Sequence, residues 1–267
     1  MRDLPPSVFA ELTAVRRLWV VGAIHGEGDR LQRLHRSIAE RFALGDRFVY
    51  LGNYLGHGTA IVETLDELVR FRRAMFLPGM EAGDFVYLRG AQEEMWRKLL
   101  QLQFATGPSE VFEWMINHGV EATLRAYGSS VDEARKLLRE GALTITRWTT
   151  RLREAMQSHP GHDDLLNSLH RAAYVEGHRI VFVHAGLDPD RPLTEQGDTF
   201  WWGSGYFEAI AAPYFGAARV VRGYDRNHRG VVATPYTLTV DGGAGFGGTL
   251  AAVCLTPDGK VLDQLEA

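Results

Sequence analysis

The sequence predicts an α/β fold in which mixed β-sheets are flanked by helices and a helical cap is inserted between two sets of strands. Three observations lead to this prediction. Short apolar runs that end at glycine precede amphipathic helical patterns repeatedly in residues 18–104, a mainly helical pattern fills 109–177, and strand patterns return between 179 and 255. Repeated strand-loop-helix units favour a parallel or mixed sheet covered by helices.

The first part of the chain contains three such units. The ligand crevice of an open α/β sheet lies beyond the carboxyl ends of its strands. We therefore expect the loops that begin at Gly22, Gly52 and Gly90 to converge. The predicted strands and their helices are, in order, 18–21 with 29–42, 47–51 with 61–71, and 85–88 with 93–104.

The middle of the chain predicts the cap. Apolar residues such as Trp114, Leu124, Trp148 and Leu152 recur at helical spacing, with polar breaks between them. We expect a helical insertion at about 107–177 within a single domain that spans 1–267. Strand patterns at 179–183, 218–221, 237–240 and 250–255 then predict a second set of strands that completes a β-sandwich.

Composition limits the classes of function. With 267 residues and 45% hydrophobic content, the chain can bury a sizeable core. Lys and Arg total 29 against 33 Asp and Glu, a net charge of -4, which argues against nucleic-acid or membrane partners. The single cysteine, Cys254, lies in an apolar run, so we expect a buried side chain. We find no apolar stretch of signal-peptide length in 1–18 and expect a soluble cytoplasmic protein.

The loops carry the segments GAIHG (22–26), GNYLGHG (52–58), GAQEE (90–94) and VHAG (183–186). In order, spacing and flanks they resemble GDxHG, GDYxDRG, GNHEE and HAG, the motifs of the calcineurin-like metallophosphoesterase superfamily, bacterial serine/threonine protein phosphatase type. The resemblance continues through NHG at 117–119 and the glycine-rich 241–248, and it covers about 19–255. It implies a metallophosphoesterase-type β-sandwich.

The same resemblance implies a chemistry. The family uses two divalent metals (Mn, Fe or Zn) that activate a water and clamp a phosphoryl group. Carboxylates and imidazoles hold such cations, and one carboxylate bridges the pair.

At the metal-binding positions this chain departs from the family. Ala23 stands where the resemblance implies the first aspartate, although the following histidine is present as His25. Asn53 replaces the bridging aspartate, and an amide with one carbonyl oxygen cannot bridge two cations as a carboxylate does. Ala91 replaces an asparagine ligand and Tyr224 the last histidine ligand.

The catalytic positions depart as well. Gly56 and His57 stand where the family has an aspartate that orients a catalytic histidine and an arginine that grips phosphate. Gln92 replaces that histidine, so the general acid is missing. Gly203 aligns with a second phosphate-binding arginine. The remnant metal positions are His25, Asn53 and His184, and we expect at most one weakly bound metal there.

Three hypotheses follow. The first is a pseudophosphatase that lacks phosphoesterase turnover and binds a protein or a phosphorylated ligand. The second is a hydrolase with an altered single-metal site, which recruits His57, Asp225 or Glu93 and cleaves a phosphate ester with an activated water. The third is a protein whose cap forms an oligomer or partner complex beside a vestigial crevice; the sequence leaves the oligomeric state open.

Several residues also have plain structural interpretations. Glu93 and Glu94 begin a predicted helix, where a capping role is expected. The cluster Asp225, Asn227 and His228 is interpreted as a solvated turn. The aromatic group Trp201, Trp202, Tyr206 and Phe207 is interpreted as core or rim packing, with a binding surface as the alternative. The positive side chains available to a crevice anion are His57, Arg89 and Arg222.

Overall fold

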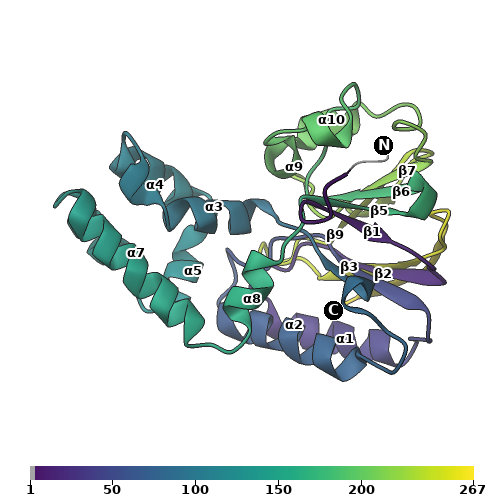
Figure 1. Ribbon diagram of the computed structural model, residues 1–267, viewed down its shortest axis with the longest axis horizontal. Helices are drawn as coiled ribbons and strands as arrows, with labels where there is room; N and C mark the ends of the chain where they lie inside the picture. Colours follow the sequence, from purple (N-terminus) through teal and green to yellow (C-terminus); the bar gives the residue numbers. More distant parts are fainter. Residues whose placement is uncertain (1–3) are drawn as a thin grey trace.

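The computed structural model describes residues 4–267 and places two mixed β-sheets face to face (Figure 1). The six-stranded sheet has the order β1-β5-β6-β7-β9-β8. Its pairs β1/β5, β6/β7 and β7/β9 are parallel, whereas β5/β6 and β8/β9 are antiparallel. Its strands are β1 (Phe9–Leu12), β5 (Ala172–Val175), β6 (Ile180–Val183), β7 (Arg219–Arg222), β8 (Gly230–Ala233) and β9 (Thr237–Asp241).

The five-stranded sheet has the order β11-β10-β2-β3-β4. Strands β2, β3 and β4 are parallel to one another, and β10 runs antiparallel to both β2 and β11. The predicted strand-loop-helix units supply the parallel part, so their loops leave the sheet at the same edge. Its strands are β2 (Arg17–Val21), β3 (Asp46–Tyr50), β4 (Phe85–Tyr87), β10 (Ala251–Leu255) and β11 (Val261–Glu266).

Strand alternation divides the apolar residues between three layers of core. In β2, Leu18 and Val20 face the other sheet, while Trp19 and Val21 face the helices. The inner layer joins these residues to Phe182 of β6 and other side chains of the six-stranded sheet. Cys254 of β10 is 1% exposed and belongs to the helix-facing layer, which confirms its predicted burial.

Helices cover both outer faces, as the fold class predicts (Figure 1). Helices α1 (Gly28–Ala39) and α2 (Ile61–Met75) pack on the five-stranded sheet through Leu31, Leu34, Leu65 and Leu68. The short helices α9 (Thr199–Trp202) and α10 (Ser204–Glu208) lie over the six-stranded sheet. Single 3₁₀ turns occur at η1 (Ala82–Asp84), η2 (Leu102–Phe104), η3 (Glu176–His178) and η4 (Leu193–Glu195).

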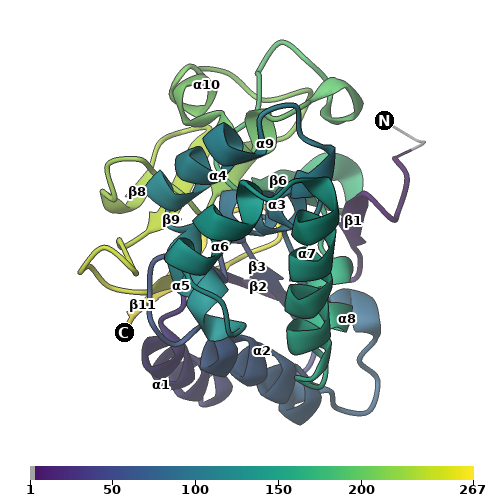
Figure 2. The same cartoon turned by 90° about the vertical axis from the view of Figure 1, so that its left-hand side faces the viewer.

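The remaining helices project to one side of the sandwich, and Figure 2 shows them from that side. Trp148 of α7 packs against Phe112 of α4 in an edge-on contact with ring centroids 6.0 Å apart, which holds two cap helices together. These helices are α3 (Ala91–Leu99), α4 (Pro108–Asn117), α5 (Val120–Ala126), α6 (Val131–Leu138), α7 (Ala142–Gln157) and α8 (His162–Asn167).

Some element boundaries differ from the sequence prediction. The helix expected over 93–104 ends at Leu99, and a 3₁₀ turn follows at 102–104. The helical pattern expected through 177 ends at Asn167, because Ala172–Val175 forms β5. Four consecutive buried residues are too few to show a periodicity, so this strand resembled a continuation of the helices. Strands β1, β8 and β11 were not predicted either; all three lie at sheet edges, and in β11 exposed residues alternate with half-buried ones.

Within residues 4–267 we find no helix with the length and apolar content needed to cross a membrane.

Candidate functional site

The loops after β2, β3 and β4 meet at the carboxyl edge of the five-stranded sheet, as their motifs predict. The backbone N–H groups of Ile24 and His25 both donate to the carbonyl of Asn53, at 3.0 and 2.6 Å. The N–H of Gln92 donates to Asn53 Oδ1 at 3.0 Å. Three segments that are distant in sequence are therefore hydrogen-bonded at one point.

Glu93 fastens these loops together. Its side chain is 4% exposed, and Oε2 accepts the N–H groups of Asn53 at 2.9 Å and Gly90 at 2.8 Å. Oε1 accepts the N–H of Leu55 at 3.0 Å. Burial raises the pKa of this carboxyl, and the backbone hydrogen bonds oppose part of that rise. The contact with Gly90 caps α3, which confirms the predicted capping role and leaves Glu93 unsuited to ligate a metal.

Glu94 also lies in the first turn of α3, as predicted, and it makes ion pairs there. Its carboxylate is ion-paired with Arg97 at 2.7 Å and with Arg89 at 3.5 Å. Burial lowers the pKa of Arg89, and the charge of Glu94 opposes that effect. The sequence predicted Arg89 as a cation available to an anion in the crevice, whereas in the structure it is ion-paired with Glu94.

His25 and Asn53 both have left-handed backbone conformations, with φ of 52° and 55°. Such angles are uncommon outside glycine, although asparagine and histidine adopt them more often than most residues do. Asn53 Nδ2 lies 3.2 Å from His25 Nε2, so the amide N–H donates to the imidazole lone pair. Burial, reinforced by the nearby histidines 57, 184 and 228, holds the pKa of His25 well below its ordinary value. His25 is accordingly neutral.

His184, after β6, lies beneath the same loops and is fully buried. Its Nδ1–H donates to the carbonyl of Leu51 at 2.8 Å, which leaves the lone pair on Nε2. Within residues 4–267, that Nε2 has no hydrogen-bond partner. Burial lowers the pKa of His184 to about 4. The ring stacks on that of Tyr224, with centroids 5.6 Å apart.

The donor set does not fit two hard cations. The oxygen of Asn53 accepts a backbone N–H, and its amide nitrogen fills the space beside His25 Nε2. Within residues 4–267, His25 and His184 do not belong to a metal-binding cluster with a carboxylate. No three His, Cys, Asp or Glu side chains in this described part of the chain are arranged to hold a metal ion. A pair of divalent cations needs anionic oxygens to balance its charge.

Two of the positions that the sequence analysis interprets as altered, Gly56 and Gln92, pack against each other. Gln92 is 4% exposed, and its Nε2 donates to the carbonyl of His118 in the cap at 2.7 Å. A Cβ at Gly56, where φ is +106°, would lie 2.6 Å from Gln92 Cδ. An aspartate at position 56 would strain the backbone, because its φ is positive, and it would displace the Gln92 side chain. Similarly, the His57 ring packs so closely on Gly119 that a Cβ there would lie 2.5 Å from Cε1.

Above this floor lies a cleft of about 550 Å³ between the sandwich and the cap. Several of the positions that the sequence identified share it: His25, Asn53, His57, Ala91, Gln92 and Tyr224. Ala23 is buried instead, and its N–H donates to the carbonyl of Gly223. Gly203 closes α9, where its N–H donates to Thr199. The roles of these positions stay predictions, while their convergence is a feature of the fold.

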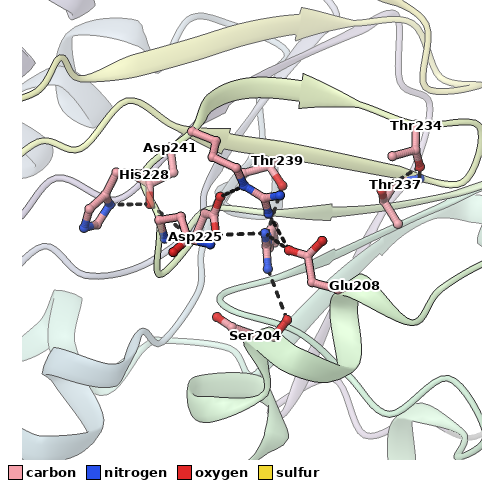
Figure 3. Close-up of polar contacts among 11 residues, drawn as sticks. Ser204, Glu208, Asp225, His228, Thr234, Thr237, Thr239 and Asp241 are labelled. Carbon is pink, nitrogen blue, oxygen red and sulfur yellow. Dashed lines mark hydrogen bonds and ion pairs between the residues drawn. The ribbon is translucent and has the colours of Figure 1, made fainter.

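Arg222 ends β7 and is fully buried in an ionic network, part of which Figure 3 shows. Its guanidinium donates to Glu208 at 2.7 Å and to the Thr239 hydroxyl at 3.0 Å, and it lies 3.2 Å from Asp225. It also lies 4.1 Å from the centre of the Phe207 ring. Two carboxylates balance its charge, so it is not a free cation for a phosphate.

The interpretation of Asp225 as solvated is wrong. Asp225 and His228 do form a turn, but Asp225 is 2% exposed and accepts from Arg229 at 2.6 Å. Burial alone would raise the pKa of Asp225, but the hydrogen bond from Arg229 and the charges of both arginines bring it below its usual value. Its N–H, together with His228 Nδ1, binds the buried carboxylate of Asp241 (Figure 3). Paired in this way, Asp225 is unsuited to metal binding.

The aromatic group is divided between core and surface. Trp201 and Phe207 are buried, as the packing interpretation requires. Trp202 and Tyr206 are 39% and 50% exposed and lie at the rim, where both rim packing and a binding surface stay open. Trp202 lies on the cleft wall and contacts Trp114 of the cap, with ring centroids 5.5 Å apart.

Glu208, Arg226 and Phe246 are among the cleft residues that were not singled out from the sequence. Phe246 is 45% exposed and lies with its ring centroid 4.3 Å from those of both His57 and His228. The only signal for it was a lone aromatic residue inside the glycine-rich loop. Arg226 is an exposed cation on the wall, in a run that was interpreted as solvated.

The sequence matches no family model and no curated protein. Solved structures share its fold. A putative diadenosine tetraphosphatase superposes with a TM-score of 0.59 and 19% identity, over 97% of this chain and 98% of that one. A serine/threonine phosphatase from Saccharomyces cerevisiae gives 0.54 and 13%, over 98% and 82%. A cold-active protein-tyrosine phosphatase of a psychrophile, Shewanella sp., gives 0.53 and 13%, over 99% and 87%. The chain therefore has the metallophosphoesterase-type fold of two mixed sheets flanked by helices, as its loop motifs predict.

Proposed function

We propose that this protein is a metallophosphoesterase-like pseudophosphatase, which binds a protein or a phosphorylated ligand in the cleft and does not turn over phosphate esters. The observation that carries the proposal is the state of Asn53. Its side-chain oxygen accepts the Gln92 N–H, and its side-chain nitrogen donates to His25. Both side-chain polar atoms of Asn53 and the Nε2 atom of His25 are therefore already engaged in hydrogen bonds within the protein.

The arrangement of the catalytic positions supports the same conclusion. In-line phosphoryl transfer needs positive charge around the phosphoryl group and an acid for the leaving group. Gln92 cannot supply that acid, and Arg222 is balanced by Glu208 and Asp225. The Gln92 side chain fills the space that a Cβ at position 56 would need. A single substitution therefore cannot introduce the missing catalytic side chains.

The cleft itself is suited to binding. Its volume of about 550 Å³ is in the range of small-molecule sites. The exposed side chains of Trp202, Phe246 and Arg226 offer apolar contact and one cation. The fold neighbours are named as a diadenosine tetraphosphatase and protein phosphatases, which supports a phosphorylated ligand or protein as the occupant.

One observation favours the hydrolase with a single altered metal site. His184 Nε2 presents a buried lone pair without a partner in residues 4–267, and an imidazole nitrogen in that state can ligate a cation. Of the additional metal ligands predicted from the sequence, Asp225 is bonded to an arginine and Glu93 to backbone N–H groups. His57, which lines the cleft, is the one left to ligate a metal.

A turnover assay separates the two functions. Purified wild type is incubated with Mn²⁺ and an aryl phosphate, a phosphopeptide or a dinucleoside tetraphosphate, beside His184→Ala as the matched control. We expect wild type and control to give the same background rate, because no general acid or metal pair is available. Mn²⁺-dependent turnover that disappears in His184→Ala would contradict the pseudophosphatase and establish the hydrolase.

A further inference from the structure

A second cavity, of about 440 Å³, lies away from the cleft and shares no residue with it. It opens between α2, the segment before β4, and α8. Helices α2 and α8 lie at the lower side of the sandwich in Figure 1. Its walls combine the apolar side chains of Val69, Phe76 and Leu165 with two arginines, Arg72 and Arg73. None of the sequence motifs falls on this cavity.

The two arginines lack acidic partners. Within residues 4–267, neither Arg72 nor Arg73 takes part in an ion pair, and neither donates a side-chain hydrogen bond. Arg70, one turn earlier on α2, binds both oxygens of Glu67 at 2.7 Å. Arg72 is half-buried and Arg73 is exposed, and both line the cavity without a carboxylate partner in the described part of the chain. Two such guanidinium groups at one cavity favour an anion.

Tyr87 adds a hydrogen-bond donor at the same place. Its side chain is 3% exposed and lines the cavity, and its hydroxyl has no partner in residues 4–267. The ring is stacked on Tyr50, with centroids 4.8 Å apart, so it cannot swing out to water. Burial raises the pKa of this hydroxyl, and the charge of Arg72 opposes the rise, as expected for a guanidinium close to the phenol oxygen. Buried hydroxyls usually have partners, and a ligand would supply this one.

We propose that this cavity binds a small organic anion, a carboxylate or phosphate monoester on an apolar body. The anionic group accepts from Arg72, Arg73 and the Tyr87 hydroxyl, and the body packs against Phe76 and Leu165. Asp164 is exposed on the α8 side of the cavity and repels the anion from that wall, which sets its orientation. The ligand would thus bridge α2 and the helix that leads from the cap to β5.

Calorimetry on the full chain with phenyl phosphate tests this site. We expect saturable binding that Arg72→Met weakens by about tenfold or more and Tyr87→Phe by several-fold, because each removes a hydrogen bond to a charged group. Asp164→Asn should tighten binding. Tyr87→Phe keeps the ring stack and removes an unpaired hydroxyl, so its thermal midpoint without ligand should equal or exceed that of wild type.

Two controls assign the site. Arg33→Met removes an exposed charge on α1 and should leave the Kd unchanged. His57→Ala alters the cleft and should also leave it unchanged, which separates this cavity from the proposed function. Benzoate tests the carboxylate arm, and inorganic phosphate tests the apolar body and should bind more weakly. The proposal is overturned if neither organic anion binds saturably, if Arg72→Met and Tyr87→Phe leave binding intact, or if inorganic phosphate binds as tightly as phenyl phosphate.

Discussion

Replacement of Glu93 by alanine is expected to lower the free energy of unfolding by at least about 3 kcal/mol, because three buried N–H groups lose their acceptor at roughly 1–3 kcal/mol each. Those groups belong to Gly90, Asn53 and Leu55, so the loss also frees the second loop from the third. Urea unfolding followed by circular dichroism measures the change.

Two further variants show that the acceptor oxygens are responsible. Glu93→Gln keeps one oxygen but places an NH₂ group against a backbone donor, so it should destabilise less than alanine does. Glu63→Ala removes an exposed carboxylate from the first turn of α2 and should stay within about 0.5 kcal/mol of wild type. A Glu93→Ala protein that loses less than about 1 kcal/mol would contradict this role.

Acid should destabilise the protein through its buried histidines. Burial lowers the pKa of His184 in the folded protein to about 4, from an ordinary value of about 6.5. Between those values the unfolded chain binds the proton that the folded protein excludes, so stability falls as the pH falls. The stability that neutral His184 contributes is complete above about pH 6.5 and is lost toward pH 4, roughly 3 kcal/mol in all.

The measurement compares the pH dependence of unfolding, rather than stability at one pH. His184→Asn keeps a donor for the Leu51 carbonyl and removes the titrating group. Its free energy of unfolding should fall less steeply between pH 7 and 4 than that of wild type. His57→Asn should remove a smaller part of the slope, because His57 lines the cleft and is less deeply buried. Equal slopes for wild type and His184→Asn would exclude His184 as the group.

The sequence predicted the parts of the fold that depend on local pattern. The runs at 18–21, 47–51 and 85–88 form parallel strands, and the glycine loops after them converge. His25, Asn53 and Gln92 meet for that reason, since strand direction alone places their loops together. The short strand Ala172–Val175 could not be predicted, because four buried residues show no periodicity and one of its two partners, β1, lies more than 150 residues earlier in the chain.

The charges were harder to predict than the loops. Arg222 and Asp225 are polar in sequence and were expected near solvent, yet each is buried by the other and by Glu208 or Arg229. Such pairings depend on tertiary contacts that one sequence does not contain. The same holds for Tyr87, whose strand position predicted burial but not the unpaired hydroxyl beside Arg72.

Metal stoichiometry tests the central claim, that the rearranged centre does not hold a catalytic metal pair. Elemental analysis of protein purified without chelator is combined with calorimetric titration of Mn²⁺, for wild type, His25→Ala and His184→Ala. We expect less than about one metal per chain in wild type and no change in either variant. The Asn53 amide already donates to His25 Nε2, and the remnant positions His25, Asn53 and His184 include no carboxylate to balance the charge of a cation. About two metals per chain, lost when His25 or His184 is replaced, would contradict it.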